Sequence, residues 1–196
     1  MALRSSHPMW NIPNLLTLLR IFLIPVFIVL FYTPLTWARL ACALVFGLAA
    51  LTDLVDGYLA RRLGQTSALG AFLDPVADKL MVAAALVLLV EADPRPLLAL
   101  PATVIIGREI AVSALREWMA EIGVRSRVAV SWIGKFKTTV QMIAILVLIL
   151  GPSPWGLPTY VPALVLLYVA AILTLWSMFV YLRAAWPSLT GPSHSP

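Results

Sequence analysis

Apolar residues fill six long runs of this chain, and short polar or proline-containing stretches separate them. Each run has about the 20 residues that an α-helix needs to cross the roughly 30 Å hydrocarbon core of a bilayer. Proline punctuates the pattern after the first, third and fifth runs, at Pro34, Pro94 and Pro152. The pattern predicts an all-α polytopic membrane protein, a bundle of six transmembrane helices. The predicted spans are residues 11–32, 36–62, 73–92, 96–120, 133–151 and 159–184.

The continuity of these runs predicts helices rather than strands. In lipid, each backbone N–H and C=O group must find its partner within the protein, which helices and closed barrels achieve. A barrel would show alternating segments of about 10 residues, and these runs do not alternate. The spans use nearly the whole chain, so we expect one membrane domain over residues 1–186. The tail 187–196 is rich in Pro, Ser and Gly, and we expect it to be flexible.

Composition agrees with a bilayer environment. Hydrophobic residues make up 61% of the chain and charged residues 12%, against about 25% charged in a soluble domain. The single cysteine, Cys42, excludes a disulfide framework and a cysteine-based metal site. In a membrane protein, the net charge of +5 reflects the orientation of the loops and contact with anionic lipid headgroups before it reflects binding of nucleic acid. No nucleic-acid partner is therefore expected.

Lys and Arg are distributed unequally between the two sides of the predicted bundle. Only Arg39 and Arg95 fall on one side, and we expect the acidic Glu91 and Asp93 there to be solvated. The positive-inside rule therefore puts both termini and the opposite side in the cytoplasm. That side collects Arg4, Arg61, Arg62, Arg125, Arg127, Lys135, Lys137 and Arg183.

Four of the five aspartates lie between residues 53 and 78, close to the predicted cytoplasmic boundary. Asp53 and Asp56 are spaced i,i+3 and Asp74 and Asp78 i,i+4, so each pair shares one helix face. A short loop makes the two helices antiparallel neighbours, and the four carboxylates can then converge. Oxygen ligands without His or Cys select hard cations such as magnesium, manganese or calcium. The alternative is a set of solvated charges at two helix ends.

The surroundings of these aspartates suit a phosphate-bearing ligand. Small residues let a bulky group approach the backbone, and they include Gly57, Ala60 and Gly70. Arg61 follows one turn after Gly57 and offers forked donors to a phosphate. A metal ion, an arginine and an acidic base together are the groups that enzymes use for phosphoryl transfer.

A polar stripe also marks the first run. Asn14, Thr17 and Arg20 are spaced i, i+3 and i+6, which places them along one side of the predicted helix. Polar residues within a membrane helix face protein or a wet cavity. The alternative is an interfacial helix start.

The pattern Asp53-x2-Asp56-Gly57-x2-Ala60-Arg61-x8-Gly70-x3-Asp74-x3-Asp78 resembles the full signature of the CDP-alcohol phosphotransferase family. The resemblance implies that Asp53, Asp56 and Asp74 hold a pair of Mg²⁺ or Mn²⁺ ions. Asp78 would touch the same metal site and act as general base. The first-run motif is similar to that of bacterial phosphatidylglycerophosphate synthases. The implied pocket for the CDP-linked lipid comprises Asn14, Thr17, Arg20, Asp53, Gly57, Ala60, Arg61, Thr66, Ser67 and Gly70.

A second group of charges lies in the fourth and fifth runs. Arg108 is deep in a predicted span and needs an anionic partner, either Glu109, Glu117, a carboxylate of the aspartate group or the substrate. An acceptor with its own phosphate would need such a cationic pocket. The segments around Arg108 and Lys137 are similar to those of phosphatidylglycerophosphate synthases, which implies glycerol 3-phosphate as acceptor. The residues expected at its phosphate are Arg108, Arg116, Lys135 and Lys137.

The resemblance predicts transfer of a phosphatidyl group from CDP-diacylglycerol to glycerol 3-phosphate, giving phosphatidylglycerol phosphate and CMP. It also implies a homodimer among the lipids of a bacterial inner membrane. One alternative keeps this chemistry with another acceptor, namely inositol phosphate, serine or phosphatidylglycerol. The other is a cation or proton transporter. Transporters commonly carry polar residues toward both membrane faces, whereas here the acids crowd one side.

Overall fold

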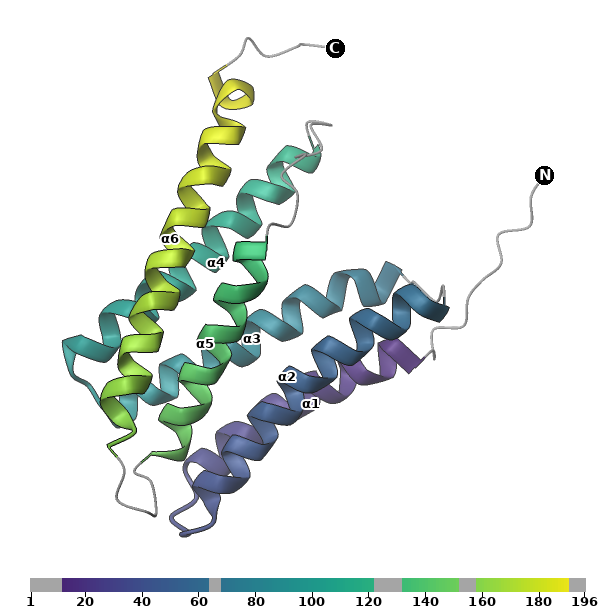
Figure 1. The fold of residues 1–196 in the computed structure, drawn as a ribbon. Coiled ribbons are helices and arrows are strands. Elements are labelled where there is room, and N and C mark those ends of the chain that lie inside the picture. The colour runs from purple at the N-terminus through teal and green to yellow at the C-terminus, as the bar shows by residue number, and fades with distance from the viewer. Residues whose placement is uncertain (1–11, 64–67, 122–131, 152–157, 191–196) are drawn as a thin grey trace.

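The computed structural model describes residues 12–63, 68–121, 132–151 and 158–190. Over these ranges the chain forms six α-helices and no strand (Figure 1). Each helix coincides with one of the apolar runs of the sequence. The helices are α1 (Ile12–Phe31), α2 (Ala38–Leu63), α3 (Ala68–Ala92), α4 (Pro96–Glu121), α5 (Trp132–Leu150) and α6 (Tyr160–Thr190).

Two helices extend beyond the runs that predicted them. α3 begins at Ala68 rather than at residue 73, and α6 continues to Thr190 rather than ending at residue 184. Residues 187–190, expected in a flexible tail, therefore belong to α6. Hydropathy marks the part of a helix that suits lipid, but helical hydrogen bonding continues past that part.

The helices form two groups that diverge toward one end of the molecule (Figure 1). α1 packs against α2 and α3, whereas α6 packs against α4 and α5. Contacts of α5 with α2 and α3, and of α3 with α4, join the two groups. The turns at residues 32–37 and 93–95 lie at the other end, which we call the turn end. The predicted site residues on α2 and α3 are placed away from the turn end.

Polar and apolar side chains are distributed as a lipid environment requires. Large apolar side chains are exposed on every helix, as Phe22, Leu44, Val87 and Phe179 illustrate. Such surfaces are unfavourable in water and suit acyl chains. Polar side chains are instead buried in the interior. They are Asn14, Thr17, Arg20, Thr52, Arg108, Lys137, Gln141 and Thr174.

Three helical stretches of the described chain are long and apolar enough to cross a membrane. They are Asn14–Phe31, Pro96–Met119 and Tyr160–Arg183, and Phe136–Leu150 is a shorter apolar helix. α2 and α3 carry the aspartates, which interrupt their apolar runs. The all-α prediction is thus confirmed over the described residues, with three helices that qualify as spans.

Candidate active site

The polar stripe of α1 faces the interior of the bundle and meets the first aspartate of the signature. Asn14, Thr17 and Arg20 are all buried, with Arg20 only 1% exposed. Arg20 Nη1 donates to Asp53 Oδ1 on α2 at 2.9 Å. A buried guanidinium without an anion would be costly, so this ion pair also fixes where the Asp53 carboxylate lies.

Asp78 on α3 belongs to the same charged group. It lines a small cavity of about 10 Å³ together with Arg20, and Met81 and Met142 close it. That volume is about the size of one water molecule's site. Asp78 is also close enough to Asp53 for the two carboxylates to interact electrostatically. Residues from three helices that are far apart in the sequence therefore share one polar region.

The described carboxylates fit part of a hard-cation site. The Asp53 side chain is 39% exposed, and Arg20 bonds to its Oδ1, which leaves Oδ2 for a cation. Asp78 is half-buried. Carboxylate oxygens are the donors that Mg²⁺ and Mn²⁺ prefer. Among the side chains that the structure describes, no group of three or more His, Cys, Asp or Glu is placed to hold a metal ion. The structure does not describe the side chains of Asp56 and Asp74.

The remaining predicted residues are placed only in part. Asp56, Gly57, Ala60 and Arg61 lie on α2 and Asp74 lies on α3, but the structure does not describe how their side chains are oriented. The same holds for Arg116 on α4 and Lys135 on α5. Gly70 is buried on α3. Thr66 and Ser67 fall outside the described residues.

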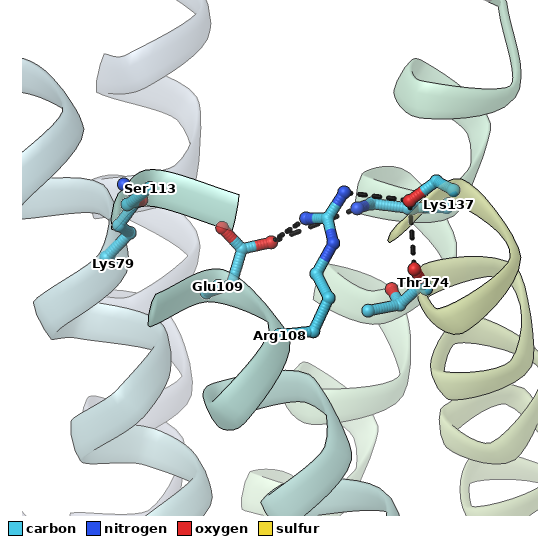
Figure 2. Close-up of polar contacts among 7 residues, drawn as sticks. Lys79, Arg108, Glu109, Ser113, Lys137 and Thr174 are labelled. Carbon is cyan, nitrogen blue, oxygen red and sulfur yellow. Dashed lines mark hydrogen bonds and ion pairs between the residues drawn. The ribbon is translucent and has the colours of Figure 1, made fainter. Parts of the chain in front are cut away.

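A second polar group joins α4, α5 and α6 (Figure 2). Of the partners open to Arg108, the structure selects Glu109, whose Oε1 accepts from Arg108 Nη1 at 2.5 Å. The same oxygen lies 3.8 Å from Lys137 Nζ, so one carboxylate holds both cations. Arg108 and Lys137, both predicted at the acceptor phosphate, are thereby brought together.

Glu109 and Lys79 connect this group to the aspartates. Glu109 is near enough to Asp78 to act on it electrostatically, as is Lys79. Lys79 directly follows Asp78 on α3 and donates to Ser113 on α4 (Figure 2). The two polar groups are therefore parts of one charged interior.

Two hydroxyl residues of α6 complete the second group, and sequence reasoning missed both. Arg108 Nη2 donates to Ser177 Oγ at 2.8 Å, and Ser177 Oγ donates to the Thr174 carbonyl (Figure 2). Their i,i+3 spacing in an apolar run was a usable signal, because polar membrane residues face the bundle interior.

Some buried polar atoms of this group have no hydrogen-bond partner within the described chain. They are Arg108 Nε and Thr174 Oγ1, and both residues are more than nine-tenths buried. A buried donor without an acceptor costs roughly 1–3 kcal/mol. Both atoms lie in the packed interior between α4 and α6.

Comparison with known proteins decides the family. Residues 10–180 match the family model described as CDP-alcohol phosphatidyltransferase. The chain belongs to this family. The match covers every residue of the signature and both polar groups, so the family assignment made from the aspartate spacing is confirmed.

Three similar curated proteins of this family carry the same name, CDP-diacylglycerol–glycerol-3-phosphate 3-phosphatidyltransferase. The protein from Pectobacterium atrosepticum is 58% identical over 183 residues, which cover 93% of this chain and 99% of that protein. The protein from Yersinia enterocolitica is 56% identical, with coverages of 93% and 98%. That from Sodalis glossinidius is 59% identical, with coverages of 89% and 94%.

Proposed function

We propose that this phosphatidyltransferase moves the phosphatidyl group of CDP-diacylglycerol to glycerol 3-phosphate, releasing CMP. The observation that carries the proposal is the joining of Asp53 and Asp78, both signature residues, with the buried Arg20 in one charged region. The similar proteins from three bacteria are named for the same reaction. The neighbouring cations Arg108 and Lys137 suit an acceptor that carries a phosphate.

In this proposal the first polar group binds the donor. Asp53, Asp56, Asp74 and Asp78 would hold Mg²⁺ or Mn²⁺, which supplies charge neutralisation to the diphosphate when bound. Arg20 orients the Asp53 carboxylate. Asn14, Thr17, Gly57, Ala60, Arg61, Thr66, Ser67 and Gly70 are proposed to line the cytidine diphosphate pocket.

The second polar group positions the acceptor. Arg108 and Lys137 bind its phosphate, with Arg116 and Lys135 as further candidates, and Asp78 accepts the proton of its hydroxyl. The hydroxyl oxygen bonds to the phosphorus that carries diacylglycerol. The bond from that phosphorus to the bridging oxygen breaks, and CMP leaves with the electron pair. Catalysis of this kind depends on positioning and electrostatics.

The proposal includes six membrane crossings with both termini on the cytoplasmic side of a bacterial inner membrane, and a homodimer. The distribution of Lys and Arg supports this orientation, and exposed apolar side chains on every helix support the crossings. A cysteine introduced at Trp37 in the turn end should then react with reagents added to the periplasmic side. Labelling from the cytoplasm alone would contradict the orientation.

An acceptor panel tests the proposed reaction. Purified protein in detergent receives CDP-diacylglycerol, Mg²⁺ and one acceptor at a time, and CMP release is measured. The acceptors are glycerol 3-phosphate, inositol phosphate, serine and phosphatidylglycerol. We expect CMP release to be highest with glycerol 3-phosphate and at least about 100-fold lower with serine, because serine lacks the phosphate that would contact the two buried cations Arg108 and Lys137. CMP release that requires serine instead would overturn the acceptor assignment.

A further inference from the structure

A cavity of about 770 Å³ opens at the turn end, away from both polar groups. Its size falls within the roughly 300–1,000 Å³ range of sites that bind small molecules. Each helix of the described chain contributes to its wall. The proposed reaction uses none of the lining residues. We call this space the turn-end cavity, and its lining includes Arg39, Leu89, Arg95, Leu98, Leu148 and Tyr160.

One of the two arginines at the turn-end cavity is already neutralised. Arg95 donates from Nε and Nη2 to both carboxylate oxygens of Asp93, at 2.5 and 2.7 Å. Its guanidinium lies 4.8 Å from the ring centroid of Tyr160, whose hydroxyl donates to Asp93 at 2.6 Å. The hydrogen bonds from Arg95 and Tyr160 lower the pKa of Asp93 to about 2. Asp93, which we expect to be solvated, is also part of this network.

The other arginine, Arg39, keeps its charge available to the cavity. It is exposed, and within the described chain no carboxylate forms an ion pair with it. Its guanidinium lies at the C-terminal end of α5, where Gly151 has a φ of 71°. This positive φ favours glycine, and a Cβ at Gly151 would come within 2.8 Å of Arg39 Nη1 and displace the tip of that side chain. The partial negative charge of this helix end helps to hold the guanidinium in place.

The wall of the cavity below these charges is apolar. Leu89, Leu98, Leu148 and Ile149 supply it, and all four are buried members of the hydrophobic core. A cation above an apolar wall matches a molecule with a phosphate at one end and an acyl chain at the other. A free anion would leave the apolar wall without an occupant. A headgroup that carries its own cation would bring a positive charge close to Arg39, which has no carboxylate partner within the described chain.

We propose that the turn-end cavity binds an anionic phospholipid, with its phosphate on Arg39 and an acyl chain along the apolar wall. Arg39 lies on the side of the bundle that has few basic residues, so the positive-inside rule does not account for its position. The site is separate from the reaction and does not depend on which acceptor the enzyme uses.

Native mass spectrometry of the detergent-purified protein tests this proposal. The probes are phosphatidylglycerol and phosphatidylcholine with matched acyl chains at equal concentration. We expect the wild-type protein to retain phosphatidylglycerol and to retain phosphatidylcholine at least about tenfold less. Arg39→Gln should lower phosphatidylglycerol occupancy by about tenfold, as loss of a charge-assisted contact predicts. Arg183→Gln, which removes an exposed arginine from α6 near its other end, should leave it unchanged.

A second variant covers the apolar part of the site. Ala92→Trp places an indole at the exposed end of α3, beside the cavity, and should also reduce phosphatidylglycerol binding. Equal retention of the two lipids would overturn the proposal, as would wild-type occupancy in both Arg39→Gln and Ala92→Trp. Glycerophosphoglycerol is the headgroup without its acyl chains. If it competes as strongly as the lipid does, the cavity is a site for free anions instead. The readout is lipid binding, so failure of the proposed reaction leaves it unaffected.

Discussion

Asp78→Asn should lower kcat for CMP release by at least about 100-fold. General-base catalysis contributes roughly 10²- to 10⁴-fold, and an amide in place of the carboxylate cannot accept the acceptor's proton. The two side chains are nearly isosteric, so the amide should occupy the same half-buried position on α3 as the carboxylate. The measurement is steady-state CMP release at saturating CDP-diacylglycerol, glycerol 3-phosphate and Mg²⁺.

The matched control for this variant is Glu91→Gln, which also exchanges a carboxylate for an amide. Glu91 is exposed near the turn end and accepts a hydrogen bond from Tyr32, far along α3 from Asp78. Its removal should leave kcat within about twofold, as surface substitutions usually do. Equal thermal stability of the two variants would show that both fold. Wild-type turnover in Asp78→Asn would remove Asp78 as the base.

Arg108→Gln should raise the KM for glycerol 3-phosphate by about 10- to 100-fold. The guanidinium is only 7% exposed, and a charge-assisted hydrogen bond in such surroundings contributes roughly 1.5–3 kcal/mol. Glu109→Gln should also raise KM, because its carboxylate orients Arg108 and Lys137. Glu109 is thus a positioning residue that acts through the two cations. KM and kcat for each variant are measured in the same CMP-release assay.

The double variant separates positioning from direct contact. If Glu109 acts mainly through Arg108, then Arg108→Gln with Glu109→Gln should raise KM little more than Arg108→Gln alone. Glu109→Asp keeps the negative charge and should recover part of the lost affinity. Fully additive effects on KM would show that Glu109 contributes independently of Arg108. A loss confined to kcat would contradict the placement of Arg108 at the acceptor phosphate.

The fold followed from the sequence because a bilayer leaves few choices. Backbone groups in lipid must pair within their own segment, so each apolar run becomes a helix. The start of α3 and the end of α6 were less predictable, since helical hydrogen bonding continues past the edge of the lipid. Which helices pack together also depends on side-chain shape and on contacts distant in the sequence. The packing of α6 against both α4 and α5 had no local signal.

The candidate site was predictable where helical periodicity alone decides the geometry. The stripe of Asn14, Thr17 and Arg20 faces inward as a polar stripe in a membrane helix must. The pairing of Arg108 with Glu109 was not predictable from helical spacing, because residues i and i+1 of a helix do not usually face each other. The pairing of Arg20 with Asp53 depends on how α1 crosses α2, which periodicity does not specify.

Binding of Mn²⁺, followed by electron paramagnetic resonance of the free ion, tests the central claim that helices α2 and α3 hold a shared metal site. The wild-type protein should bind two ions, as the family signature implies. Asp53→Asn and Asp78→Asn should each weaken binding by at least about tenfold, since even outer-shell partners contribute roughly 10- to 100-fold. Glu91→Gln should bind as the wild type does. Wild-type Mn²⁺ affinity and stoichiometry in both aspartate variants would contradict a metal site built on these residues.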